Sequence, residues 1–375
     1  MSKKGDMNLN IPFVDLKAQY LSLKPEIDAA IHSVIERTAF IRGPFAEEFE
    51  KSFAGKYGVK YCISCANGTD AIYITLKALG IGPGDEVITV ANSWISTSET
   101  ITQAGAKPVF VDIEPDYYHI DPQRIEEKIT PRTKAVIPVH LFGQAARIDA
   151  IQKICEKHNI LLIEDCAQAH FATYQGRRAG SFGIAGTFSF YPGKNLGAYG
   201  DAGAIITNDD GLATRALMFA NHGSLRKHLH DIEGINSRMD GIQAAVLSVK
   251  LKYIDEWNLA RNKNALTYNH LLSSIDHVKT PKIRENSLHI FHLYVIRVEK
   301  RDELANFLKS KGIETGIHYP TALPFMPAYK YLGHKAEDFP VAHKYQEEII
   351  SLPMFPELKN DQIGYIADSI KEFYK

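Results

Sequence analysis

The chain has 375 residues, of which 45% are hydrophobic, so it is long enough to bury a large core and is expected to form two domains. Its 43 basic and 44 acidic residues leave a formal net charge of −1, which argues against nucleic acid or an anionic membrane as a partner. No run of about 18 apolar residues occurs and the start is polar, so we expect no signal peptide and no membrane span, but a cytoplasmic protein with a small-molecule partner.

Four cysteines are too few for a disulfide framework in a chain of this length. Cys62 and Cys65 form a C-x-x-C pair, but they fall in a segment that is predicted to be a buried strand. A zinc site would need a second ligand pair, and a redox motif would open a helix. We therefore expect a structural role for this pair, and core positions for Cys155 and Cys166.

Apolar segments of strand length alternate with segments of helical period through most of the chain. The predicted strands are 61–66, 86–90, 108–113, 135–140, 160–164, 186–190 and 204–207, and the predicted helices between them are 70–79, 95–104, 122–129 and 148–158. This alternation predicts an α/β fold with a mostly parallel central sheet flanked by helices.

The pattern changes after Gly241. A long helical pattern runs to about residue 271, and it is followed by a half-buried strand at 291–298, an amphipathic helix at 301–311 and a closing helix at 361–374. We expect a flexible N-terminal segment at 1–10, a large domain at 11–254 and a smaller C-terminal α+β domain at 255–375.

Two of the predicted strands end in polar or aromatic residues that suit a ligand. After the first strand, Gly68 permits a tight backbone and Thr69 can cap the next helix, whose N-terminus suits a phosphate. Trp94 follows the second strand and can lie flat on a planar ring. Taken alone, the first feature is also an ordinary helix cap, and Trp94 could equally be a core residue.

Asp165 stands at the carboxyl end of the apolar strand 160–164, where ligands of such sheets bind. A buried carboxylate needs a partner, and a protonated ring nitrogen would be one, because the ion pair keeps a pyridine ring cationic and electron-withdrawing. Gln168 could contact a ring hydroxyl. For Asp165 alone, helix capping is the alternative.

Lys194 lies in a glycine-rich loop between the strands 186–190 and 204–207. A lysine that forms a Schiff base must be held by backbone that can approach closely, which the four glycines of this loop allow. A lone lysine here would be a solvated loop residue. Together with Asp165 and the turn at Gly68, it makes pyridoxal phosphate the economical explanation.

These residues belong to motifs that resemble the DegT/DnrJ family of sugar-nucleotide aminotransferases, a branch of the fold type I aspartate aminotransferase superfamily. The motifs are NGTDA, ANSWISTSETI, IEDCAQAH, SFYPGKNLGAYGDAGA, INSRMDGIQAA and GIHYP. They occur in the order of the family, and the resemblance extends from residue 11 nearly to the C-terminus.

The resemblance implies roles for individual residues. Lys194 would form the Schiff base with the cofactor, Asp165 would pair with the ring nitrogen, and Gln168 would contact the ring hydroxyl. The phosphate would be held by Gly68, Thr69 and Ser189, with Trp94 stacked on the ring, and by Asn236 from the other subunit of a homodimer. The sugar nucleotide would contact Arg238, His318 and Tyr319.

The implied reaction moves an amino group from L-glutamate to a nucleotide-linked oxo-sugar, with 3-oxo sugars favoured over 4-oxo sugars. The alternatives are a 4-oxo-sugar aminotransferase and a non-catalytic regulator that keeps the cofactor. A dehydratase branch of the family has histidine at the position of Lys194, so this lysine argues against dehydration. Arg238 could pair with a uronic acid carboxylate or with a diphosphate.

Overall fold

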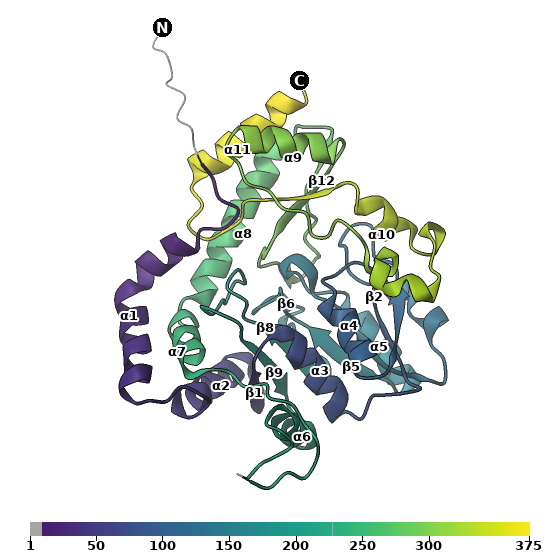
Figure 1. The fold of residues 1–375 in the computed structure, drawn as a ribbon. Coiled ribbons are helices and arrows are strands. Elements are labelled where there is room, and N and C mark those ends of the chain that lie inside the picture. The colour runs from purple at the N-terminus through teal and green to yellow at the C-terminus, as the bar shows by residue number, and fades with distance from the viewer. Residues whose placement is uncertain (1–9, 227) are drawn as a thin grey trace.

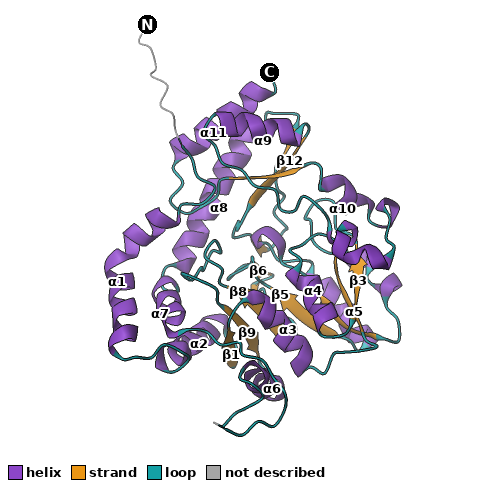
Figure 2. Cartoon of the chain, viewed as in Figure 1, coloured by secondary structure: helices purple, strands orange, loops and turns teal. Residues whose placement is uncertain are grey.

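The computed structural model describes residues 10–226 and 228–375. The predicted flexible segment therefore lies outside the described residues except for Asn10. Figure 1 shows a large lower part built around one sheet, and an upper part in which α8, α9 and α11 surround β12. Figure 2 shows helices on both faces of the large sheet. The division of the chain into domains at residue 254 stays a prediction.

The large sheet has seven strands in the order β1-β9-β8-β5-β4-β2-β3. Their bounds are β1 Tyr61–Cys65, β2 Glu86–Val90, β3 Lys107–Val111, β4 Thr133–Ile137, β5 Leu161–Asp165, β8 Ala185–Ser189 and β9 Gly203–Thr207. Only β9 runs against its neighbours in this sheet. The predicted mostly parallel α/β fold is thus confirmed.

Helices cover both faces of this sheet because successive side chains of its strands point to opposite faces. In β9, for example, Ile205 packs with α3 and α6, whereas Ala204 and Ile206 pack into the core on the other face. The helices of the first face are α3 Gly68–Ala78, α4 Ser96–Gln103 and α6 Asp210–Ala220, and those of the second are α2 Pro44–Tyr57, α5 Ile148–His158 and α7 Gly241–Lys250.

The upper part contains a three-stranded antiparallel sheet, β10-β12-β13, packed against long helices. Its elements are α8 Ile254–Leu272, β10 Val278–Lys279, β12 Tyr294–Val298, α9 Arg301–Ser310, β13 Ile349–Leu352 and α11 Asn360–Phe373. A short helix, α10 Pro340–Tyr345, precedes β13, and three short strands, β6 Thr173–Tyr174, β7 Arg177–Arg178 and β11 Ser287–Leu288, form a third sheet.

Several predicted elements differ from the structure. The helix predicted at 122–129 is two short 3-10 turns, because Pro131 disfavours a helical conformation at Thr130 and leaves too few residues for a helix. The helix predicted from 241 to 271 is broken at residues 251–253, between α7 and α8. The strand predicted from 291 begins only at Tyr294.

Four of the α-helices in the described ranges were not predicted. α1 Leu16–Glu36 contains Pro25 and buries few side chains, so its sequence lacks a clear apolar stripe. The others are α2, α6 and α10. All four cysteines are buried and unpaired, as predicted, and Cys62 and Cys65 lie in β1.

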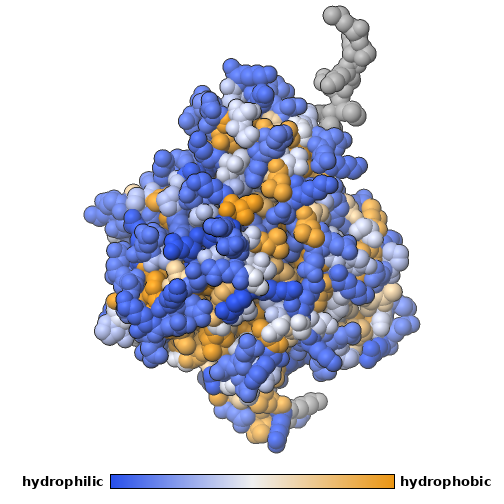
Figure 3. Space-filling view, turned by 180° about the vertical axis from the view of Figure 1, so that it is seen from behind, coloured by the Kyte–Doolittle hydropathy of each residue, from blue (hydrophilic) through white to orange (hydrophobic). Residues whose placement is uncertain are grey.

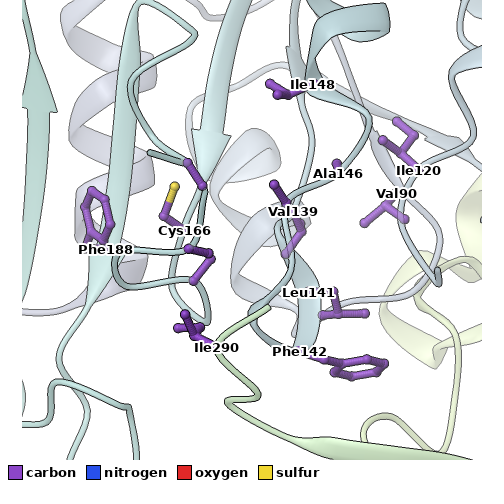
Figure 4. Packing of buried hydrophobic residues seen from close by; sticks show 14 of the residues in the cluster. Val90, Ile120, Val139, Leu141, Phe142, Ala146, Ile148, Cys166, Phe188 and Ile290 are labelled. Atoms are coloured by element: carbon purple, nitrogen blue, oxygen red, sulfur yellow. The ribbon is translucent and has the colours of Figure 1, made fainter. Parts of the chain in front are cut away.

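The core lies directly behind the strand ends that carry the polar residues. Figure 4 shows Val139 after β4, Cys166 after β5 and Phe188 in β8 packed into one apolar cluster. This packing holds the ends of three neighbouring strands rigidly. None of the helices in the described ranges is both long and apolar enough to cross a membrane.

Candidate active site

The carboxyl ends of β1, β2, β5 and β8 meet at one edge of the sheet because these strands are parallel. They open into a cavity of about 570 Å³. Nine of the predicted site residues line it, and they are Gly68, Thr69, Trp94, Asp165, Gln168, Ser189, Lys194, His318 and Tyr319. The structure therefore brings together residues that are up to 251 positions apart, counting from Gly68 to Tyr319 (319 − 68).

Lys194 lies on the loop after β8, half-buried in the cavity wall. Its backbone N–H donates to the Tyr191 carbonyl at 2.8 Å. The loop folds so tightly that a Cβ at Gly197 would lie 2.2 Å from the carbonyl oxygen of Pro192, so only glycine fits there. Burial lowers the pKa of Lys194 to about 8, although the negative charge of Asp165 opposes this shift.

Asp165 is the last residue of β5 and is 4% exposed. Its Oδ1 accepts the backbone N–H of Ala167 at 3.0 Å, and its Oδ2 accepts the Thr97 hydroxyl at 2.8 Å. Burial raises the pKa of Asp165, while these two donors and the charge of Lys194 lower it. Asp165 is therefore a turn-forming carboxylate that faces the cavity, and not a helix cap.

The turn after β1 forms a narrow cradle. Gly68 approaches Ser189 at the end of β8 so closely that a Cβ at Gly68 would lie 2.5 Å from the Cβ of Ser189. α3 begins at Gly68 and is capped by the side chain of Asn67, which accepts the Asp70 N–H at 2.8 Å. The expectation that Thr69 caps this helix was wrong, because Thr69 lies inside the first turn.

α3 begins beside the cavity, and because the first N–H groups of a helix have no partner within it, this helix start can bind an anion. The Thr69 hydroxyl lies 2.7 Å from that of Ser96, at the start of α4. Ser96 also lines the cavity. The N-termini of α3 and α4 therefore each place a hydroxyl group at the same part of the cavity wall.

Gln168 is held in one orientation. Its Oε1 accepts the backbone N–H of Phe142 at 2.7 Å, and its Nε2 donates to the Tyr319 hydroxyl at 3.0 Å. Because the backbone donor fixes which end is oxygen, the amide presents N–H groups on the side of the cavity. Trp94 is 60% exposed, and its ring lies 5.8 Å from that of Tyr319, so it forms an open aromatic wall and is not a core residue.

His318 is fixed from two sides. Its Nδ1 lies 2.8 Å from the Ser351 hydroxyl, and its ring stacks on Phe13 at 5.6 Å between centroids. Burial and the nearby Lys194 lower the pKa of His318 to about 4, so its imidazole is neutral at physiological pH.

Two predicted residues are elsewhere in the single chain. Within the described ranges, Asn236 and Arg238 line a neighbouring depression, not the cavity. Asp201 contributes to both, so the two hollows adjoin. Arg238 Nε is buried without a hydrogen-bond partner.

Sequence reasoning missed Thr97, Asn195 and His292. Asn195 follows Lys194, and its Nδ2 donates to the Ile290 carbonyl at 3.2 Å while its Oδ1 lies 3.1 Å from His292 Nδ1. His292 also lines the cavity. No local pattern identifies it, because it meets the lysine loop only through a contact over 97 positions.

Comparisons with known proteins agree with this geometry. A model of the DegT/DnrJ/EryC1/StrS aminotransferase family matches residues 21–371. The chain is 48% identical to a "pleiotropic regulatory protein" of Geobacillus stearothermophilus, with 98% of this chain and 99% of the relative covered. It is 44% identical to the UDP-2-acetamido-2-deoxy-3-oxo-D-glucuronate aminotransferase of Pseudomonas aeruginosa, with 96% and 99% covered. The crystal structure of S. venezuelae DesV in complex with a ketimine intermediate superposes with a TM-score of 0.96 at 40% identity, covering 98% of this chain and 99% of that one.

Proposed function

Since this chain belongs to the DegT/DnrJ/EryC1/StrS aminotransferase family and several of its relatives are named sugar-nucleotide transaminases, we propose that it transfers an amino group from L-glutamate to a nucleotide-linked 3-oxo sugar. The observation that carries this proposal is the convergence of Lys194, Asp165 and the Gly68–Ser189 cradle on one cavity. Each of these features meets a different part of the cofactor.

The residues of the cavity fit pyridoxal phosphate. The absence of a Cβ at Gly68 lets the start of α3 lie against Ser189 beside the cavity, and the N-terminus of α3 supplies donors and a positive dipole for a phosphate. Asp165 would hold the ring nitrogen, Gln168 the ring hydroxyl, and Trp94 one face of the ring. The bound cofactor supplies an electron-withdrawing ring and stores the amino group between the two halves of the reaction.

Lys194 has the properties of a proton carrier. Burial lowers its pKa to about 8, so far more of its amine is neutral and able to accept a proton near neutral pH than for an exposed lysine. We propose that Lys194 Nζ removes a proton from the substrate carbon that bears the amino group. It would then deliver this proton to the cofactor carbon on the other side of the transferred nitrogen. Asp165 keeps its negative charge beside the ring throughout, which stabilises the cationic ring nitrogen.

The sugar would lie toward His318 and Tyr319, at the side of the cavity away from the cradle. The neutral ring of His318 and the Tyr319 hydroxyl can bind hydroxyl groups of an uncharged sugar. The name of the Pseudomonas relative supports a 3-oxo substrate. A 4-oxo sugar is the alternative, and both a 6-deoxyhexose and a uronic acid would be compatible with Arg238.

We further propose that the active unit is a homodimer, with Asn236 and Arg238 of one chain completing the site of the other. In the single chain these residues line a depression that adjoins the cavity at Asp201. Figure 3 shows apolar side chains in the middle of the rear face and near the loop at its lower end. The loop after α6 exposes Leu225, Leu229 and Ile232 to about half of their full area. Such apolar surface favours contact with a second chain.

The alternative of a regulator without turnover is supported by the name of the Geobacillus relative, a pleiotropic regulatory protein. A regulator would need the cofactor but not a proton carrier. Because Lys194 keeps a reactive amine and Asp165 a fixed carboxylate, the geometry favours catalysis. A cytoplasmic location stays a prediction.

A screen separates these proposals. The purified protein, loaded with cofactor and treated with L-glutamate, should lose its visible absorbance. Nucleotide-linked 3-oxo and 4-oxo sugars are then added one at a time. A 3-oxo sugar should restore the absorbance fastest. Restoration only by 4-oxo sugars would favour the alternative substrate, and no response to glutamate would favour the regulator.

A further inference from the structure

Two buried hydroxyl groups form a chain that ends on Asp165. The Thr97 Oγ1 donates to Asp165 Oδ2 at 2.8 Å, and the Ser93 Oγ lies 3.2 Å from Thr97 Oγ1. Ser93 is 2% exposed and Thr97 is 1% exposed. Neither hydroxyl is therefore a surface group satisfied by bulk water.

The direction of the chain follows from the chemistry of its end. An ionised carboxylate only accepts hydrogen bonds, so the hydroxyl hydrogen of Thr97 points to Asp165. Thr97 then has only lone pairs left, and Ser93 must be the donor to it. The chain runs from Ser93 to Thr97 to Asp165, and each link strengthens the next by polarisation.

The Asp165 carboxylate accepts hydrogen bonds from two different elements. Thr97 belongs to the first turn of α4, whereas Ala167, which donates to the other oxygen, lies in the turn after β5. Two donors on two oxygens fix both the position and the plane of the carboxylate. Each oxygen keeps a lone pair for a further donor, and Ser93, Thr97 and Asp165 all line the cavity.

We infer that Thr97, supported by Ser93, is a positioning residue that holds Asp165 ionised and in the plane required by the ring nitrogen of the cofactor. This inference rests on the role proposed above for Asp165. A carboxylate oriented in advance needs no rearrangement when the ring arrives, which is the condition for strong electrostatic stabilisation.

Removing the Thr97 hydroxyl should remove one hydrogen bond to Asp165 and leave its carboxylate in place. Thr97→Val keeps the shape of the side chain, but the Asp165 oxygen loses its donor in a buried place. The pKa of Asp165 then rises, so a proton shared with the ring nitrogen would move toward the carboxylate and away from the ring. With less positive charge on the ring, Lys194 Nζ in its bond to the cofactor would keep its proton to higher pH.

The experiment measures two quantities on the cofactor-loaded protein that do not depend on turnover. One is the dissociation constant of pyridoxal phosphate from equilibrium dialysis, and the other is the pH midpoint of its visible absorbance. For Thr97→Val we expect about tenfold weaker binding, the size of one hydrogen bond to a charged group, and a midpoint shifted to higher pH. Thr97→Ser, which keeps the hydroxyl, should restore both values toward those of the parent protein.

The matched control is Thr100→Val. Thr100 lies one turn further along α4, is fully buried, and its hydroxyl donates to the Ser96 carbonyl at 2.8 Å. This substitution has the same chemistry in the same helix, but the Thr100 hydroxyl contacts only backbone carbonyls, including that of Thr97 at 3.5 Å, and makes no hydrogen bond to Asp165. It should leave both quantities unchanged. An equal effect of Thr100→Val and Thr97→Val would show that any loss of a hydroxyl from α4 disturbs the site, and would overturn the inference.

Ser93 is tested by a double-mutant cycle. If Ser93 acts through Thr97, then Ser93→Ala shifts the midpoint in the parent protein and adds nothing to Thr97→Val. Additive effects would mean that Ser93 acts separately from Thr97, and would contradict the proposed hydrogen-bond chain from Ser93 through Thr97 to Asp165. Asp165→Asn distinguishes a failure of the role proposed for Thr97 from a failure of the role proposed for Asp165. A large effect of Asp165→Asn with none of Thr97→Val contradicts the inference alone, whereas no effect of either contradicts the role of Asp165 itself.

Discussion

Gly68 and Ser189 come from two strand ends that are separated in the sheet only by β9, and their backbones approach so closely that a Cβ on Gly68 would lie 2.5 Å from the Cβ of Ser189. Real Cβ atoms do not approach each other so closely. The glycine is therefore required by packing against Ser189, and both residues line the cavity.

Gly68→Ala should displace Ser189 or the start of α3 and so distort the cradle. We expect the affinity for pyridoxal phosphate to fall at least about tenfold, with the fold retained. Equilibrium dialysis gives the affinity, and circular dichroism gives the fold. The control is Gly364→Ala in α11, where a Cβ would meet open space and should leave cofactor binding unchanged. Unchanged binding in Gly68→Ala would mean that the phosphate lies elsewhere.

The lowered pKa of Lys194 predicts how the cofactor-free protein reacts with pyridoxal phosphate. Only the neutral amine attacks the cofactor carbonyl, and the pKa is about 8 instead of 10.5. The rate of visible absorbance gain should therefore rise about tenfold per pH unit below pH 8 and level off above it. A rate that keeps rising to pH 10 would show that Lys194 has the pKa of an ordinary surface lysine.

Asp165→Asn retains the shape of the side chain and removes its charge. Both half-reactions should slow by about 100-fold or more, which corresponds to about 2.7 kcal/mol of barrier, because an amide does not keep the ring nitrogen protonated. Stopped-flow absorbance after mixing with L-glutamate measures the first half-reaction. The melting temperature should be kept, since an uncharged side chain is less costly to bury. Near-normal rates would reduce Asp165 to a turn-forming residue.

A shared active site predicts complementation between two inactive variants. Chains with Lys194→Ala and chains with Asn236→Ala are each impaired alone. After subunit exchange, the hybrid dimer has one intact centre, formed by Lys194 of the second chain and Asn236 of the first. Activity of the mixture should rise well above the sum of the separate variants.

Exchange must be verified independently, for example by mass spectrometry of differently tagged chains. If hybrids form and activity does not rise, Asn236 does not act across the interface. Two preparations of Lys194→Ala with different tags, mixed in the same way, provide the control that exchange alone creates no activity.

Much of the site could be predicted because its residues follow strand ends. Asp165 and Lys194 each come next to a buried apolar run, and parallel strands necessarily bring such ends to one edge of the sheet. Thr97 escaped prediction because it lies inside a helix, where a threonine gives no sign of what its hydroxyl meets. His292 reaches the site from the loop before β12, and no local spacing encodes that contact.

The fold shows the same limit. Periodicity located the buried strands and α5, whose bounds agree with the prediction at both ends. It failed at α1, where Pro25 and a mostly exposed surface hide the helical pattern. It also joined α7 to α8, because both helices bury apolar faces and the turn between them has no glycine or proline.

Transfer of isotope from donor to product tests the central claim most directly. The cofactor-loaded protein is incubated with ¹⁵N-labelled L-glutamate and a nucleotide-linked 3-oxo sugar, and the product is analysed by mass spectrometry and NMR. The account predicts one ¹⁵N atom per sugar, attached to carbon 3, with 2-oxoglutarate formed in equal amount, and no transfer in Lys194→Ala. An unlabelled or dehydrated sugar, or label that reaches the sugar equally in Lys194→Ala, would contradict it.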